Sequence, residues 1–232
     1  MTKLDEALQK LAEVEQLIHN FQLETATEAL PSIVPELPIP DIAQKGLQLP
    51  DAFYDYIRGD VGELFPVMSA SQFEGIQVDL AKGAGVLPLG WMAYCLATDY
   101  HETNQQMQGV KEAYWCSEEW RKTHLRYYPW YGRGKVQLTW EKNYKLASDK
   151  LGVDLIANPD KALELDIAAS VLVTGMLEGW FTGKKLRDYI PNAPTKQHYI
   201  NARQIVNGKD KAELIASYAV VFEEALKRGQ WL

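Results

Sequence analysis

The sequence predicts a mainly α-helical fold with one short hairpin or extended segment, preceded by an N-terminal helix and a proline-rich linker. Apolar residues recur at intervals of three and four over most of the chain, which is the helical period. Residues 127–140 interrupt this pattern with glycine, aromatic and β-branched residues, which favour extended backbone. Because 47% of the 232 residues are hydrophobic, the chain can bury a core, and no run of about 18 apolar residues predicts membrane insertion.

The first fifty residues are expected to be separate from the rest of the chain. Residues 1–30 predict an amphipathic helix, in which a stripe from Leu4 to Phe21 repeats every three or four positions. That stripe either forms a coiled-coil seam, giving an oligomer or a virion attachment, or docks onto the neighbouring domain. Residues 31–50 hold five of the eleven prolines and predict a linker or an extended wrap.

Residues 51–232 predict a single helical domain. The glycines at 83 and 85 end one short helix, and Pro88 starts another whose apolar stripe, continued by four residues from Thr98, reaches Glu102. We expect helices at 72–82, from Pro88 to Glu102, and at 141–151, 159–180 and 208–228.

The charge distribution argues against a nucleic-acid partner. Residues 1–60 carry eleven acidic and four basic side chains, whereas the remaining residues carry twenty of each. The main body therefore has no net field to attract a polyanion. The N-terminus has no apolar signal segment, and Cys95 and Cys116 are too few for a disulfide framework, so we expect a protein made in the cytosol with reduced thiols.

Several kinds of catalytic site are excluded by spacing. His101-Glu102 would need a second histidine at position 105 to bind zinc, but Gln105 is there. The glycines at 132 and 134 lack the third glycine of a dinucleotide fingerprint, and no serine or cysteine nucleophile elbow is present. We therefore expect neither metal nor cofactor, and water as the attacking group.

A pair of carboxyl groups suits the remaining chemistry. Glycoside hydrolysis needs one carboxylic acid to protonate the leaving oxygen and usually a second carboxylate to activate water. Glu102, at the end of an apolar helix, is the candidate acid. Trp130 and Tyr131 lie in an aromatic-rich segment and are either platforms for sugar rings or core residues. The candidates for the second carboxylate are Glu112, Glu118 and Glu119.

Four strings in a fixed order carry a resemblance to a known family. His101-Glu102-Thr103 is followed about thirty residues later by a nine-residue string, Tyr-Gly-Arg-Gly-Lys-Val-Gln-Leu-Thr, at 131–139. Asn143-Tyr144 and then Ile205-Val206-Asn207-Gly208 complete the order. Over residues 70–226 the chain resembles glycoside hydrolase family 19, which contains chitinases and endolysins of bacteriophages, and it looks closer to the phage and bacterial branch.

The resemblance implies a two-lobed, lysozyme-like helical fold and an inverting mechanism. Glu102 matches the general acid, and Glu112 matches the second carboxylate best, with Glu118 and Glu119 as alternatives. Thr139 matches the residue that holds the attacking water. Inversion implies carboxyl oxygens roughly 6.5–9.5 Å apart, because water must fit between them. The residues expected to bind or support the substrate are His101, Trp130, Tyr131, Gln137, Asn143 and Asn207.

The resemblance also sets the expected function. We expect hydrolysis of a β-1,4-linked N-acetylated amino-sugar polymer, with peptidoglycan favoured over chitin. The enzyme would reach the cell wall through a holin or by delivery within a virion. A virion or delivery component with little activity is the alternative, and so is a true chitinase. The family often places glycines after its Glu-Thr, whereas Thr103 is followed here by Asn104 and Gln105, which puts the loop over the sugar in doubt.

Overall fold

Helix α4 (Leu89–Glu102) is the central helix of the described structure, a computed structural model that describes residues 45–59 and 65–232. Every residue from Met92 to Tyr100 is buried. A helix that is buried all round must be enclosed by other elements, and α4 packs against α3 (Ala70–Gly83), α7 (Leu165–Glu178) and α9 (Ala212–Arg228). The predicted acid, Glu102, is the last residue of this helix.

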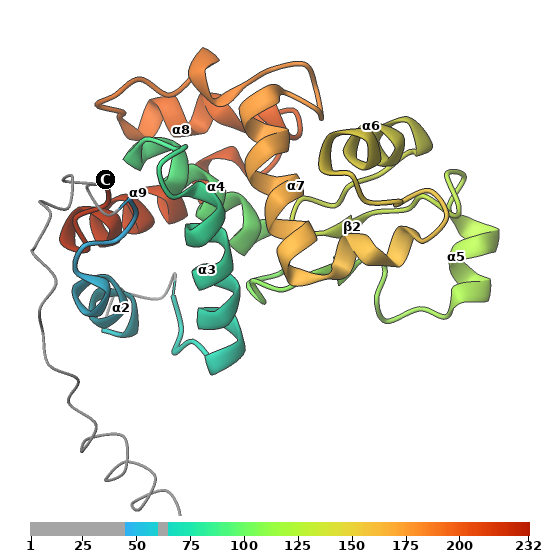
Figure 1. The fold of residues 1–232 in the computed structure, drawn as a ribbon, viewed down its shortest axis with the longest axis horizontal. Coiled ribbons are helices and arrows are strands. Elements are labelled where there is room, and N and C mark those ends of the chain that lie inside the picture. Colours follow the sequence, from blue (N-terminus) through green and yellow to red (C-terminus); the bar gives the residue numbers. More distant parts are fainter. Residues whose placement is uncertain (1–44, 60–64) are drawn as a thin grey trace, which may run out of the picture. The chain divides into compact units, whose positions relative to one another are not determined.

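The other elements lie around this centre (Figure 1). In that view α5, α6 and β2 lie on one side of α7, whereas α2, α3, α4, α8 and α9 lie on the other. The mainly helical fold with a small ladder, expected from the sequence, is confirmed. The remaining elements are α2 (Pro50–Arg58), β1 (Val110–Lys111), α5 (Glu118–His124), β2 (Arg133–Gly134), α6 (Glu141–Leu151) and α8 (Lys196–Ala202), with three 3₁₀ helices, η1 (Pro159–Leu163), η2 (Leu186–Asp188) and η3 (Arg203–Ile205).

The expected extended segment is a small antiparallel ladder. Val110 pairs with Gly134, and Lys111 pairs with Arg133. Arg133 also bridges to Leu138, so the chain turns back tightly between them. The partner strand, β1, was not expected, because two residues are too few to show an alternating pattern.

The helices predicted within the described residues are confirmed, with three differences. A capping box between Ser69 and Gln72 starts α3 two residues before the expected position. The helix expected at 159–180 is divided, because Glu164 has extended backbone between η1 and α7. The helix expected from 208 starts at Ala212, since Lys211 before it is left-handed. The short helices α2, α5 and α8 were not expected; each has nine residues or fewer.

The last residues of the expected linker belong to the folded unit. Gly46 and Leu232 exchange two backbone hydrogen bonds of 3.1 Å, and Leu47 forms a bridge with Trp231. Residues 45–49 are thus an extended wrap, and α2 begins at Pro50. The predicted helix at 1–30 and the prolines before residue 44 lie outside the described residues. Within the described ranges, no helix is both long and apolar enough to traverse a bilayer, and both cysteines are free thiols.

Candidate active site

Glu102 is held at the end of α4 by an arginine that comes from a distant part of the chain. Its Oε1 lies 2.6 Å from Nη1 of Arg203 in η3, and the Glu102 side chain is 16% exposed. Arg203 is itself buried, and its Nε donates to the carbonyl oxygen of Asp210 at 3.0 Å. The acid candidate is therefore a partly buried carboxyl with a rigid cationic neighbour. No sequence pattern pointed to Arg203, because it lies 101 positions from Glu102.

The neighbours of Glu102 in the triplet have different roles. Thr103 is buried; its hydroxyl donates to the Asp99 carbonyl oxygen at 2.7 Å and accepts from the Met107 amide at 2.9 Å. It thus ends the helix and starts the next loop. Burial lowers the pKa of His101. The cations Arg203 and Lys211 lower it further, whereas the carboxylates of Glu102 and Asp210 act in the opposite direction. At neutral pH His101 is therefore uncharged.

The loop after Thr103 has an unusual backbone. Asn104, Gln105 and Met107 have φ values of 50°, 69° and 56°, a left-handed conformation that costs roughly 1–2 kcal/mol in residues other than glycine. The loop borders a cavity of about 430 Å³ whose lining carries only hydroxyl and amide side chains, namely Ser69, Ser71, Gln72, Asn104, Gln105, Gln106 and Gln108.

Glu112 follows directly on β1, and both of its carboxylate oxygens accept hydrogen bonds. Tyr127 donates its hydroxyl to Oε1 at 2.6 Å, and the Gly132 amide donates to Oε2 at 2.9 Å. Burial and the adjacent carboxylate raise the pKa of Tyr127 to about 12, so its phenol remains a donor. A Cβ at position 132 would lie 2.6 Å from Oε1 of Gln137 and 3.2 Å from Glu112. A side chain at position 132 would therefore push the Gln137 amide away from its present place.

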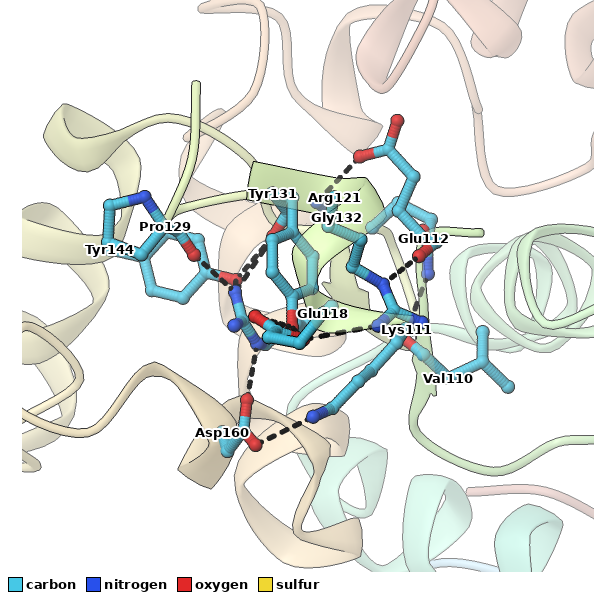
Figure 2. Close-up of polar contacts among 12 residues, drawn as sticks. Val110, Lys111, Glu112, Glu118, Arg121, Pro129, Tyr131, Gly132, Tyr144 and Asp160 are labelled. Atoms are coloured by element: carbon cyan, nitrogen blue, oxygen red, sulfur yellow. Dashed lines mark hydrogen bonds and ion pairs between the residues drawn. The ribbon is translucent and has the colours of Figure 1, made fainter. Parts of the chain in front are cut away.

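Glu118 and Tyr131 support the loop that carries Glu112 (Figure 2). Arg121 donates from Nε to the Glu112 carbonyl oxygen at 2.9 Å, and it pairs with Glu118 at 3.1 Å. The Tyr131 hydroxyl also donates to Glu118. Tyr131 is fully buried under the guanidinium of Arg133, 3.6 Å from its ring centre. In this conformation Tyr131 offers no face to a sugar, so the core interpretation holds for it, not the platform.

The three polar residues of the second motif form one chain of hydrogen bonds. Gln137 is left-handed and donates to the carbonyl oxygen of Val110 in β1 at 3.1 Å. Thr139 donates to the Gln137 carbonyl oxygen at 2.7 Å, and Asn143 donates to that of Thr139 at 2.8 Å. The Gln137 side chain lies close to Gly132, whose backbone amide donates to the Glu112 carboxylate.

Two further predicted residues lie elsewhere. Trp130 is half-buried against the core, and its indole nitrogen is buried without a hydrogen-bond partner in the part of the chain that the structure describes. Asn207 is exposed in the turn after η3, where its backbone nitrogen donates to the Arg203 carbonyl oxygen at 3.0 Å. It is therefore connected to the Glu102 side of the site through Arg203.

The sequence interpretation missed a group of exposed aromatic side chains between β1 and α6. Trp115 is 76% exposed and meets Tyr114 edge to face, while Trp140 packs against Tyr127. Trp120 of α5 is also exposed. The large number of aromatic residues in this loop-rich stretch is the sequence feature that could have indicated them. Among the described residues no three histidine, cysteine or acidic side chains gather as a metal-binding group.

The structure thus holds two partly buried carboxyl groups, one at the end of a buried helix and one directly after a small ladder, and these are the groups that acid–base hydrolysis uses. A family model described as chitinase class I, glycoside hydrolase family 19, matches residues 83–198, which is half of the chain. The chain belongs to this family.

The curated relatives are plant chitinases. Chitinase 8 of Oryza sativa is 41% identical over 64 residues, covering 26% of this chain and 24% of the relative. An endochitinase of Arabidopsis thaliana is 27% identical over 141 residues, covering 59% of this chain and 48% of the relative. The chain thus spans about half or less of the length of the curated relatives it matches.

Solved structures of chitinases are similar at low identity. Chitinase C of Streptomyces griseus is 20% identical with a TM-score of 0.44, and 76% of each chain is covered. A class IV chitinase of Zea mays is 19% identical with a TM-score of 0.44, covering 78% of this chain and 92% of that one.

Proposed function

We propose that this protein hydrolyses β-1,4 bonds next to N-acetylated amino sugars, with Glu102 as general acid and Glu112 as general base. The proposal rests on one observation: the two glutamates that match the family pattern are both partly buried and hydrogen-bonded. Glu102 accepts from Arg203, and Glu112 accepts from Tyr127 and from the Gly132 amide. Glu118 is a weaker candidate for the base, since the cation Arg121 pairs with its carboxylate, whereas both donors to Glu112 are neutral.

The proposed reaction is a single displacement. Glu102 donates its proton to the glycosidic oxygen as the bond to the anomeric carbon breaks. Water attacks that carbon from the opposite face, and Glu112 accepts the proton that the water loses. The configuration therefore inverts. As Glu102 becomes a carboxylate, the Arg203 guanidinium, 2.6 Å from it, stabilises the developing charge.

Thr139 completes the proposed machinery as the residue that orients the water. Its hydroxyl donates to the Gln137 carbonyl oxygen, which leaves its oxygen lone pairs to accept a hydrogen bond. Gln137 and Asn143 keep this hydroxyl in place. The amide-lined cavity after Thr103 supplies uncharged donors and acceptors, which suit sugar hydroxyl and acetamido groups.

For the substrate we propose peptidoglycan, reached at the bacterial cell wall through a holin or within a virion. The support is that the chain, over residues 70–226, resembles the phage and bacterial branch of the family more than the plant chitinases. Chitin is the second candidate, favoured by the names of the plant relatives. In either case the polymer consists of β-1,4-linked N-acetylated amino sugars.

The test is digestion of purified sacculi and of chitin oligosaccharides by the full chain and by Glu102→Gln. Glutamine keeps an oxygen that accepts from Arg203, so the variant is expected to fold, while the transferable proton is gone. We expect wild-type turnover to fall by at least about 100-fold in the variant. The new reducing end, identified by mass spectrometry, names the bond that is cut. An absence of products from both polymers with the folded wild type would instead favour a structural or delivery role.

A further inference from the structure

Three charged side chains are completely buried together behind the candidate active site. They are Asp79 of α3, Asp99 of α4 and Lys135, which directly follows β2, and each side chain is 0% exposed. Lys135 Nζ lies 2.7 Å from Asp99 Oδ2 and 2.8 Å from Asp79 Oδ1, and it donates to the Gly75 carbonyl oxygen at 3.0 Å. The cluster therefore connects two helices with the loop of the ladder.

The charges of this cluster do not balance if both carboxyl groups are ionised. Two carboxylates against one ammonium leave a net negative charge, and an uncompensated buried charge costs several kcal/mol. Cys95, one turn before Asp99, adds no charge, because burial and the two aspartates raise its pKa well above the usual value. Its thiol faces the sulfur of Met176 in α7.

The hydrogen bonds point to a missing proton. Asp79 Oδ2 and Asp99 Oδ1 have no hydrogen-bond partner within the described part of the chain, and Asp79 Oδ1 has only the Lys135 ammonium, 2.8 Å away. A proton on one carboxyl would let it donate to the other, which would pair a carboxyl oxygen of Asp79 with one of Asp99 and bring the cluster to neutrality. Consistent with this, burial and the neighbouring Asp79 raise the pKa of Asp99 well above its usual range, and burial also raises that of Asp79.

The position of the cluster relates it to both halves of the site. Asp99 lies three residues before Glu102, and its carbonyl oxygen accepts from both the amide and the hydroxyl of Thr103. Lys135 lies two residues before Gln137 and four before Thr139. The Lys135–Asp99 bond thus joins the segment that carries the proposed acid to the segment that carries the proposed water-holding residue.

We propose that Asp79 and Asp99 share one proton and, with Lys135, form a buried clamp that positions Glu102 relative to Thr139. The three are positioning residues, since none reaches the reacting atoms. The catalytic part of this inference rests on the proposed function, whereas the shared proton does not.

The shared proton is tested without any substrate. Infrared difference spectra between wild type and Asp99→Asn at neutral pH should show the carbonyl band of a protonated carboxylic acid in the wild type and its loss in the variant. Asp99→Asn should stay folded, because asparagine replaces a protonated carboxyl by another neutral donor. The double variant Asp79→Asn/Asp99→Asn leaves the Lys135 ammonium without a carboxylate and should lower the melting temperature strongly. Absence of that band in the wild type, or a double variant as stable as the single one, would overturn the shared proton.

The shared proton also predicts a direction with pH. An acid whose pKa is raised in the folded state stabilises the fold fully below its unfolded pKa, and this contribution is lost as the pH rises through the folded pKa. Asp99→Asn removes that titration. Relative to wild type, the variant should therefore gain stability as the pH is raised from 4 (about the unfolded pKa) towards neutral and beyond, measured by denaturant unfolding. A constant difference across this range would contradict the inference.

The positioning role is tested with Lys135→Met. If the clamp sets the geometry, kcat should fall by about 10- to 100-fold, as expected for a displacement of about 1 Å, while KM changes little. Phe53→Ala, a cavity in α2 remote from the cluster, is the control for lost stability and should keep kcat at temperatures where it is folded. If Lys135→Met does not fold, the double variant Lys135→Met/Asp79→Asn is assayed in its place, because it removes one charge of each sign. Wild-type kcat in either folded variant would refute the positioning role and leave the proposed function untouched.

Discussion

At the scale of single residues, the loop after Glu102-Thr103 combines backbone strain with polar side chains. Glycine would adopt φ values of 50° to 70° at little cost, yet Asn104, Gln105 and Met107 occupy these positions. The backbone of Gln105 is used, because its amide donates to Tyr100 and its carbonyl oxygen accepts from Gln72. Its side chain makes no hydrogen bond to the described residues and lines the amide-rich cavity. Strain of this kind is often found where a side chain serves binding.

Gln105→Gly should therefore stabilise the fold and weaken substrate binding. Relief of the left-handed conformation is worth about 1 kcal/mol, reduced by the greater freedom of glycine in the unfolded chain. Loss of the side-chain amide should raise KM several-fold, while the packing of the core stays unchanged. Denaturant unfolding and steady-state kinetics give both quantities. The matched variant is Gln105→Ala, which removes the amide without relieving strain and should raise KM with little change in stability. An unchanged KM in both variants would remove Gln105 from the substrate site.

At the scale of elements, the stretch from β1 to α6 is held by buried cations and presents aromatic side chains outward. Arg133 pairs with Asp160 of η1 at 2.8 Å and donates to the Tyr144 hydroxyl at 3.1 Å, which ties β2 to η1 and α6. On the outside, Tyr114, Trp115 and Trp140 expose large aromatic faces. Exposed aromatic groups of this size next to a candidate active site indicate a binding surface.

Trp115→Ala is expected to weaken binding of polymer and to leave the fold intact. Because the indole is mostly exposed, the free energy of unfolding should change by less than about 0.5 kcal/mol. KM for the long polymer should rise several-fold, with kcat close to that of wild type. The control is Val67→Ala, which removes another highly exposed apolar side chain and should change neither. Equal KM values for Trp115→Ala and wild type would show that this loop does not contact the substrate.

At the scale of the folded unit from residue 45 onward, its first residues and the C-terminus close on one another. Trp231 is nearly buried, and its indole nitrogen donates to the Leu87 carbonyl oxygen at 2.9 Å, directly before α4. Gly46 and Leu232 pair through their backbones. Both ends of this unit are thereby packed beside the start of the helix that carries Glu102.

Trp231→Ala should lower the free energy of unfolding by about 3–5 kcal/mol, since a large buried side chain and a hydrogen bond are lost together. Trp231→Phe keeps most of the apolar volume and should lose clearly less. Thermal and denaturant unfolding of the full chain measure both changes. If the alanine variant were as stable as wild type, the packing of the C-terminus would not contribute to the fold.

Much of the fold was predictable from local pattern. The helices α3, α4 and α6 follow from apolar periodicity, with end signals such as Gly83 and Pro88 for the first two, and they agree with the structure within two residues. The division of the helix expected at 159–180 was not predictable, because a single extended residue, Glu164, leaves the apolar period almost unchanged. Helices of seven to nine residues, such as α5 and α8, are too short for the period to distinguish them from turns.

The sequence alone determined the helical class, the family resemblance and the two glutamates on which the proposed chemistry depends, because these are carried by spacing within short segments. Only the tertiary structure decided which charges meet. Arg203 reaches Glu102 across 101 positions, Lys135 reaches Asp79 and Asp99 inside the core, and Tyr131 is withdrawn from the surface by Arg133. The physical reason is that a buried charge has to find its partner in space, and packing of distant helices brings that partner to it.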